Sequence, residues 1–206
     1  MLRTIGLGAA GVGLGGLGLL SACASSDEGA AAGGSSTTTP PLPPTYDPSQ
    51  PYWLQGNFRA VTTEETVTDL EVVGKLPAEL SGLFVRNGSN PPSGHADHWF
   101  LGDGMVHGVR LSDGEAQWYR NRYVGTTIHD GGGDYGGIPQ DADNQSNVAL
   151  VHHGGKLLAL GEVGWPYELD PADLATVGPW DYAGRLGATM TAHPKIDPET
   201  GRMHFF

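Results

Sequence analysis

The chain has 206 residues, and its 23 Asp and Glu against 11 Lys and Arg give a formal net charge of -12 at pH 7. A chain of this length has room for one domain of ordinary size, which excludes a large two-domain enzyme. The negative charge repels phosphate backbones, so no nucleic-acid partner is expected.

Residues 1–23 have the composition of an export signal. They carry one cation, Arg3, no acidic residue, and a Gly-rich apolar run that is too short and too weakly apolar for a membrane span. The run ends at Leu20-Ser21-Ala22-Cys23, which resembles a bacterial lipobox, the motif whose cysteine is acylated. We expect a lipoprotein signal peptide, with lipidated Cys23 anchoring the exported protein at a membrane of the cell envelope. An ordinary signal peptide with an incidental cysteine is the alternative.

Residues 24–51 have the composition of a linker. They are small and polar at first and then rich in proline from Pro40 to Pro51. Such a segment cannot bury enough apolar surface to offset the entropy of ordering it. We therefore expect a flexible tether that stiffens toward its proline end, and a folded domain over residues 52–206.

From Tyr52 onward the pattern indicates short strands joined by turns. No stretch of twelve or more residues keeps an apolar period of 3.6, whereas β-rich runs bounded by Gly, Asp, Asn and Pro recur. One such run, Leu83–Val85, is bounded by Asn87-Gly88. A hairpin is expected from residues 105–111 and 118–124. The fold class is therefore all-β.

Two further hairpins, with a strand between them, are expected from residues 147–160, 165–169 and 191–206. Repeated antiparallel hairpins with polar turns fit a β-sandwich or several blades of a β-propeller, since a blade takes about 40 to 50 residues. The apolar strand that ends at Phe206 would leave an unpaired edge, so we also expect the chain to be truncated.

The eight histidines are the soft metal ligands to consider, because the only cysteine, Cys23, belongs to the export signal. The segment 95–98 is similar to part of the H-x-H-x-D-H zinc motif, but Ser93 stands where the first histidine should be. A zinc hydrolase is therefore not favoured. His107 alternates with apolar residues and is expected to pack within a strand, and His152-His153 is expected to be solvated at a turn.

Seven segments, in this order along the chain, resemble the N-terminal part of the carotenoid cleavage oxygenase family. Residues 73–82 resemble its G-x-L-P-x-x-L-x-G motif, and residues 98–105 resemble H-W-F-D-G-D-G-M, with Leu101 in place of an acid. The other segments are Leu54–Phe58, Arg86–Pro91 with Ser89 where the family has proline, Tyr119–Val124, Ala159–Glu162 and Thr191–Pro198. Each motif by itself is weak evidence for the resemblance, but the set of seven in this order is specific to the family.

The resemblance implies a seven-bladed β-propeller, incomplete here because residues 52–206 match only its N-terminal portion, with an iron(II) ion held by four histidines. The segment Thr191-Ala192-His193-Pro194 resembles the one that carries the first ligand, so His193 is the expected metal ligand. Glu162 resembles a carboxylate that accepts a hydrogen bond from a ligand histidine and orients it. No catalytic side chain is assigned. Four further residues are expected to be structural: Arg86, His98, Asp103 and Arg122.

The implied activity is that of a non-haem iron(II) dioxygenase, which uses dioxygen to cleave a conjugated carbon–carbon double bond into two carbonyl products. The substrate would be an apolar polyene, such as a carotenoid or apocarotenoid, or a stilbene-type phenolic. One histidine cannot hold iron(II), so residues 1–206 alone are expected to be inactive. The alternative is a catalytically inactive envelope lipoprotein with at most a binding role.

Overall fold

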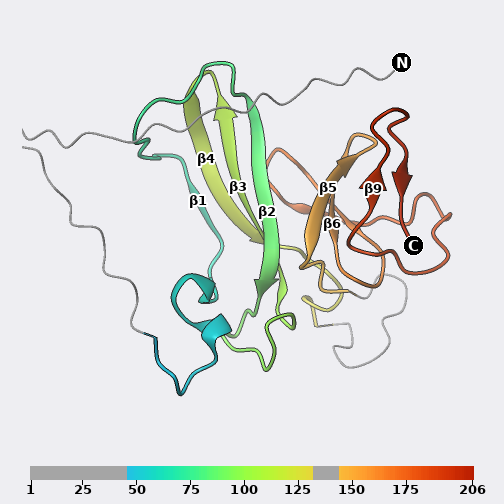
Figure 1. The fold of residues 1–206 in the computed structure, drawn as a ribbon, viewed down its shortest axis with the longest axis horizontal. Helices are drawn as coiled ribbons and strands as arrows, with labels where there is room; N and C mark the ends of the chain where they lie inside the picture. Colours follow the sequence, from blue (N-terminus) through green and yellow to red (C-terminus); the bar gives the residue numbers. More distant parts are fainter. Residues whose placement is uncertain (1–45, 132–143) are drawn as a thin grey trace, which may run out of the picture. The chain divides into compact units, whose positions relative to one another are not determined.

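The structure is a computed structural model that describes residues 46–131 and 144–206 (Figure 1). The expected signal peptide, its Cys23 and the expected linker up to residue 45 lie outside the described residues. The only helices in the described ranges are two short 3-10 turns, η1 (Tyr52–Leu54) and η2 (Gly56–Phe58). None is long and apolar enough to cross a membrane. The predicted all-β class is therefore confirmed.

The first sheet is antiparallel, with the strand order β1-β4-β3-β2. Its strands are β1 (Glu65–Val67), β2 (Gly82–Asn90), β3 (Asp103–Ser112) and β4 (Glu115–Tyr123). The β3–β4 hairpin turns at Asp113 and Gly114, which both have positive φ, 55° and 79°. A two-residue turn with this backbone matches the twist of the flanking strands, and Asp-Gly is a preferred pair for it. The first predicted hairpin is confirmed.

Strand β2 is longer than the sequence pattern predicts. The pattern ends the strand at Asn87-Gly88, and this is wrong, because pairing with β3 continues to Asn90 opposite Asp103. Gly88 stays in the ladder opposite Met105, while the Asn87 side chain donates a hydrogen bond to the carbonyl of Ser146. The turn preference of Asn-Gly is thus overruled by a tertiary contact that gives the amide a partner outside the strand.

The second sheet is an antiparallel meander with the order β5-β6-β7-β8. Its strands are β5 (Ala149–His153), β6 (Lys156–Leu160), β7 (Tyr167–Leu169) and β8 (Thr176–Pro179). The β5–β6 hairpin turns at Gly154 and Gly155, both at positive φ, as the sequence predicts. β8 is an addition that the sequence pattern does not indicate.

The third sheet is a short antiparallel pair, β9 (Lys195–Ile196) and β10 (Met203–His204). The hairpin is where the sequence places it, but the expected first strand over residues 191–196 shrinks to two residues. Pro194 has no N–H to donate to a ladder, so the strand begins after it. Thr191 still contacts the segment after β10 through its N–H, which donates to the carbonyl of Phe206 at 2.9 Å.

Strand β6 of the second sheet, which lies beside the first sheet in Figure 1, is buried on both faces. Side chains in β6 alternate between the two faces. Leu157 and Ala159 join Val106 of β3 and Val124, the residue after β4, in one apolar cluster. Leu158 and Leu160 point the other way, into a cluster with Met190, Ala192 and flanking aromatic residues. Burial on both faces explains why β6 is a continuous apolar run.

Candidate metal site

The structure brings the two predicted site residues into contact. His193 Nε2 lies 2.7 Å from Glu162 Oε1, although 31 residues separate them in sequence. The His193 side chain is 61% exposed and that of Glu162 is 54% exposed. A carboxylate–imidazole contact this open to solvent contributes little to folding stability. The contact therefore orients the imidazole more than it stabilises the fold.

Glu162 is positioned by the close passage of the chain at the end of β6. A Cβ on Gly161 would lie 2.9 Å from Asn144 Oδ1, so only glycine fits there without a shift. The Asn144 side chain is itself fixed, since it donates to the carbonyl of Trp165 and accepts from Ser146. Gly161 thus lets the backbone pass Asn144 and places Glu162 at the edge of the second sheet.

His193 is positioned by the buried residues that precede it. Met190 and Ala192 are buried in the second apolar cluster. The His193 N–H donates to Thr191 Oγ1 at 3.3 Å. Because Pro194 restricts the conformation of the residue before it, the imidazole leaves a backbone that is held on both sides.

The His193–Glu162 pair lies in the wall of a pocket of about 620 Å³. Apolar side chains make up much of this wall, and the Trp99 and Phe100 rings are stacked with their centroids 6.2 Å apart. The other apolar lining residues are Leu101, Val148 and Val163. Trp99 and Phe100 were not predicted as site residues, although two adjacent aromatic residues in a loop were a signal for a binding site. We call this space the metal-side pocket.

The two side chains fit the roles of one metal ligand, His193, and of the carboxylate that orients it, Glu162. Glu162 accepts a hydrogen bond from Nε2–H, which leaves the lone pair of His193 Nδ1 available for a metal. Within residues 46–131 and 144–206, however, no group of three or more His, Cys, Asp or Glu side chains could hold a metal ion. The described residues therefore supply part of an iron(II) site, namely one histidine ligand and its carboxylate partner.

The other histidines have structural contacts. His107 Nδ1 is 2.8 Å from the Tyr119 hydroxyl, which confirms the expectation that it packs within a strand. His98 Nδ1 accepts from the Phe100 N–H, and its ring packs against Trp53 and Phe100, in keeping with a structural role. His152 is exposed as expected. His153 differs, because its Nε2 bonds to the carbonyl of Gly201 at 2.9 Å.

Comparison with known proteins decides the family. The sequence pattern of the retinal pigment epithelial membrane protein family matches residues 58–206. The chain belongs to the carotenoid cleavage oxygenase family. It is 43% identical over 175 residues to the carotenoid cleavage oxygenase of Mycobacterium tuberculosis, covering 76% of this chain and 33% of the relative. The chain spans about a third of the length of the curated relatives it matches.

Two other relatives act on stilbenes according to their names. Resveratrol cleavage oxygenase 1 of Aspergillus fumigatus is 37% identical over 179 residues, which cover 79% of this chain and 36% of the relative. The crystal structure of the lignostilbene dioxygenase of Pseudomonas brassicacearum superposes with a TM-score of 0.65 at 32% identity, covering 76% of this chain and 36% of that chain. The carotenoid oxygenase fold described above is therefore shared with solved members of the family.

A second carboxylate–imidazole pair lies away from the metal-side pocket. Asp103 Oδ2 accepts from His129 Nδ1 at 2.7 Å, and the His129 ring stacks on Tyr123 with centroids 4.7 Å apart. The Asp103 side chain is only 4% exposed, and its Oδ1 has no hydrogen-bond partner among the described residues. The contacts agree with the structural role expected of Asp103. Arg122 is also structural, since it donates to the Glu65 carbonyl and to Thr66 Oγ1 in β1.

The buried Asp103 carboxyl predicts a pH dependence of stability. Burial raises its pKa above the usual value, while the hydrogen bond and positive charge of His129 act in the opposite direction. A carboxyl group whose pKa is higher in the folded than in the unfolded protein stabilises the fold while it is protonated. This contribution is complete below the unfolded pKa of about 3.9 and is lost as the pH rises through the folded pKa.

We therefore expect the wild type to lose stability as the pH rises above about 4, and Asp103→Asn not to show this loss. The measurement is the urea midpoint at several pH values from 4 to 7 for both proteins. The carboxyls of Asp47 and Asp197, whose pKa values hydrogen bonds lower, act in the opposite direction but equally in both proteins. Asp69→Asn, at an exposed site, is the control and should follow the wild type. If the urea midpoint changed with pH in the same way in Asp103→Asn and in the wild type, the effect would not come from the Asp103 carboxyl.

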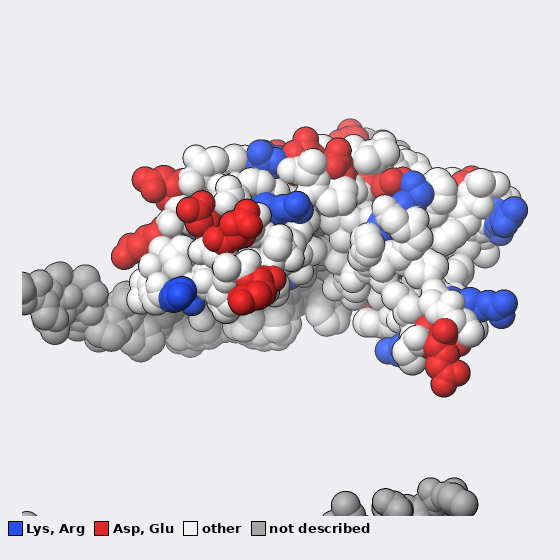
Figure 2. Space-filling model, turned by 90° about the horizontal axis from the view of Figure 1, so that it is seen from above, with Lys and Arg blue, Asp and Glu red and all other residues white. Residues whose placement is uncertain are grey.

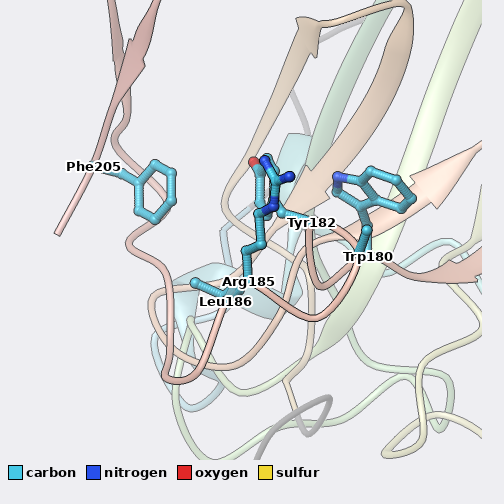
Figure 3. A pocket seen from close by; sticks show the side chains of 6 residues that line it. Trp180, Tyr182, Arg185, Leu186 and Phe205 are labelled. Carbon is cyan, nitrogen blue, oxygen red and sulfur yellow. The ribbon is translucent and has the colours of Figure 1, made fainter.

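An aromatic pocket of about 540 Å³ lies next to the third sheet (Figure 3). Tyr182 is central to it, with its ring 6.0 Å from that of Trp180 and 5.8 Å from that of Phe205. Arg185 and Leu186 complete the labelled wall in Figure 3. None of the predicted site residues lines this pocket, so it is not part of the candidate metal site.

Charge on the face of the described residues that Figure 2 shows is mixed. In Figure 2, acidic groups are spread over the visible face with basic groups between them, and no large area carries one sign.

Proposed function

We propose that residues 52–206 form the N-terminal portion of a non-haem iron(II) dioxygenase. Its substrate would be a carotenoid, an apocarotenoid or a stilbene-type phenolic, cleaved at a conjugated double bond into two carbonyl products. The observation that carries the proposal is the His193–Glu162 contact in the wall of a mostly apolar pocket. Relatives named carotenoid and resveratrol cleavage oxygenases support both substrate classes.

The fold supports the same proposal. Two four-stranded antiparallel sheets lie side by side, and the second is covered on its far face by residues next to the third sheet. Consecutive four-stranded sheets packed face to face are the building units of a β-propeller. We interpret the described residues as the first blades of the seven-bladed propeller that the family resemblance implies.

Each part of the site has a separate task in the proposed reaction. Iron(II), when bound, would supply the activation of dioxygen next to the double bond. His193 would donate one ring nitrogen to the metal, and Glu162 would fix the orientation of the imidazole by accepting a hydrogen bond from the other ring nitrogen. Trp99 and Phe100 would exclude water and hold an apolar substrate against this side of the metal-side pocket.

A second candidate function follows from the single ligand. Among the described residues, His193 is the one histidine at a family ligand position, and no larger metal-binding group exists there. One imidazole cannot hold iron(II) against water, so we propose that the 206-residue chain by itself is catalytically inactive. In that state the metal-side pocket could serve at most as an apolar binding site.

The test compares how much iron is retained by variants of a full-length family protein that includes these residues. Glu162→Gln is expected to weaken iron binding 10- to 100-fold, because loss of a carboxylate partner that orients a ligand has effects on the order of this size. Iron content after dialysis against a chelator, and oxygen uptake with a carotenoid or resveratrol, are the measurements. The 206-residue chain should retain no iron under the same conditions.

Glu199→Gln provides a matched control, because Glu199 lies exposed in the β9–β10 turn and outside the metal-side pocket. It should retain iron like the wild type. Unchanged iron retention in Glu162→Gln would refute the role given to Glu162. Stoichiometric, tightly held iron and carotenoid cleavage by the 206-residue chain would refute the partial site.

A further inference from the structure

Trp99 and Phe100, the aromatic part of the wall of the metal-side pocket, are the two central residues of a turn. The Leu101 N–H closes this turn by donating to the carbonyl of His98 at 3.1 Å. The turn belongs to no sheet, because it lies between the end of β2 and the start of β3. Its position therefore depends on contacts from outside the turn. We call residues 98–102 the aromatic loop.

Asn147 holds the aromatic loop from the side of the second sheet. Its Nδ2 amino group donates to the carbonyls of Phe100 and Gly102, at 2.9 Å and 2.6 Å. A side-chain amide has two N–H groups to donate, so both are used for this one loop. Asn147 is 8% exposed and its bond to Gly102 is buried, so loss of the amide would leave that carbonyl unpaired away from water.

The backbone next to Asn147 is tied to the strand that leads to Glu162. The N–H of Val148 donates to the carbonyl of Leu160, the last residue of β6, at 3.0 Å. Glu162 follows Leu160 by two residues and contacts His193. Asn147 therefore connects the aromatic loop with the metal-side pair of Glu162 and His193.

The end of the aromatic loop is also fixed on the side of the first sheet. The Gly102 N–H donates to Ser89 Oγ at 2.8 Å. A Cβ on Gly102 would lie 2.6 Å from the backbone N of Asn90 and 2.7 Å from that of Pro91, so the loop passes directly against the end of β2. The first sheet thus fixes the last residue of the loop, while Asn147 also holds the carbonyl inside the turn.

We propose that Asn147 is a positioning residue for the substrate, an inference that rests on the proposed dioxygenase function. Asn147 sets how far the rings of Trp99 and Phe100 stand from Glu162 and His193, and thereby how an apolar substrate fits between them. It acts through these rings and not on the reacting bond. The hydrogen bonds that carry the inference join described residues to one another, so they do not depend on what else covers the pocket.

The test is steady-state cleavage of a carotenoid or resveratrol by a full-length family protein that includes these residues. We expect Asn147→Ala to raise KM about 10-fold or more, because small displacements of a positioning group are costly. The kcat should stay within about 3-fold of the wild type, since lost binding that substrate and transition state share appears in KM alone. Iron retention should be unchanged. An unchanged KM would overturn the proposal.

Asn121→Ala is the matched control, because Asn121 is also a buried asparagine whose Nδ2 donates to a backbone carbonyl. Its partner is Thr63 at 2.8 Å, and neither residue lines the metal-side pocket. Asn121→Ala should lower stability, as Asn147→Ala does, and leave KM unchanged. An equal rise of KM in both variants would show a general loosening of the fold and would overturn the role of Asn147.

Asn147→Ser is a milder variant for the case that Asn147→Ala does not fold. Its hydroxyl has one hydrogen to donate in place of two, so KM should lie between the wild-type value and that of Asn147→Ala. A wild-type KM in Asn147→Ser, combined with an unfolded Asn147→Ala, would show that the residue serves folding only and would overturn the proposal.

Hydrogen exchange of the aromatic loop gives a readout that needs no catalysis. In the same full-length protein, the amides of residues 98–102 should exchange roughly 10-fold faster in Asn147→Ala, and those of residues 157–160 in β6 at the wild-type rate. An active wild type with unchanged loop exchange in the variant would overturn this inference alone. A wild type without cleavage activity would contradict the proposed function, and the inference with it.

Discussion

Replacing Gly104 with alanine should destabilise the protein by about 3 kcal/mol, since extra atoms in a packed interior cost about 1–3 kcal/mol and more where nothing can yield. Gly104 is buried in β3, and its N–H donates to the carbonyl of Gln145 at 2.8 Å. A Cβ at this position would collide with the carbonyl group of Ser146 and lie 2.8 Å from the carbonyl oxygen of Gln145. These obstacles are backbone atoms, which cannot rotate away as a side chain can.

Urea unfolding measures this effect, with Gly88→Ala as the control. Gly88 lies in the neighbouring strand β2, and a Cβ there would have no heavy atom within 4 Å. Its substitution should change the free energy of unfolding by about 0.5 kcal/mol at most. Equal midpoints for Gly104→Ala and Gly88→Ala would show that the approach of residues 145 and 146 to β3 is not as close as described.

Truncation of Tyr167 to alanine should lower the free energy of unfolding by about 3–5 kcal/mol, the cost typical of removing a buried aromatic side chain. Tyr167 is 1% exposed and lies in the apolar cluster that joins the first two sheets. Its hydroxyl accepts the Thr127 N–H at 3.1 Å, so the side chain also holds the segment that follows β4. Both the packing and this contact are lost in Tyr167→Ala.

Tyr167→Phe separates the two contributions. It keeps the ring and removes only the hydroxyl, and we expect a loss of about 0.5–1.5 kcal/mol, the net value of one hydrogen bond. Thermal and urea unfolding of the three proteins give the comparison. Val177→Ala, at an exposed position of β8, should stay close to the wild type. If Tyr167→Ala lowered the free energy of unfolding no more than Tyr167→Phe does, the ring would not contribute to the packing between the two sheets.

Local sequence signals were sufficient for the hairpins of this fold. Asp113-Gly114 and Gly154-Gly155 each adopt the positive φ that their turns require, so composition alone places these two turns. β1 and β8 were not predicted, because short strands of three or four residues have too little alternation to show. β1 is held by contacts from the distant strand β4, including the side chains of Asn121 and Arg122.

The candidate site was predictable only through the family resemblance. Spacing along the chain gives no reason to connect Glu162 with His193, because the contact depends on how the end of β6 meets the segment before β9. The pair of Asp103 and His129 shows the same limit. Their 26-residue separation carries no motif, and only the folded β3 and the segment after β4 bring them to 2.7 Å.

Strand β6 contributes alternate residues to two separate apolar clusters, and this makes it the cooperative link of the structure. Leu157 and Ala159 hold the first sheet, while Leu158 and Leu160 hold the residues that lead to His193. Local opening of either cluster would loosen the same five-residue strand. The orientation of Glu162, which lies two residues after the end of β6, is thus coupled to the integrity of both interfaces, so a cavity far from the site could still loosen its geometry.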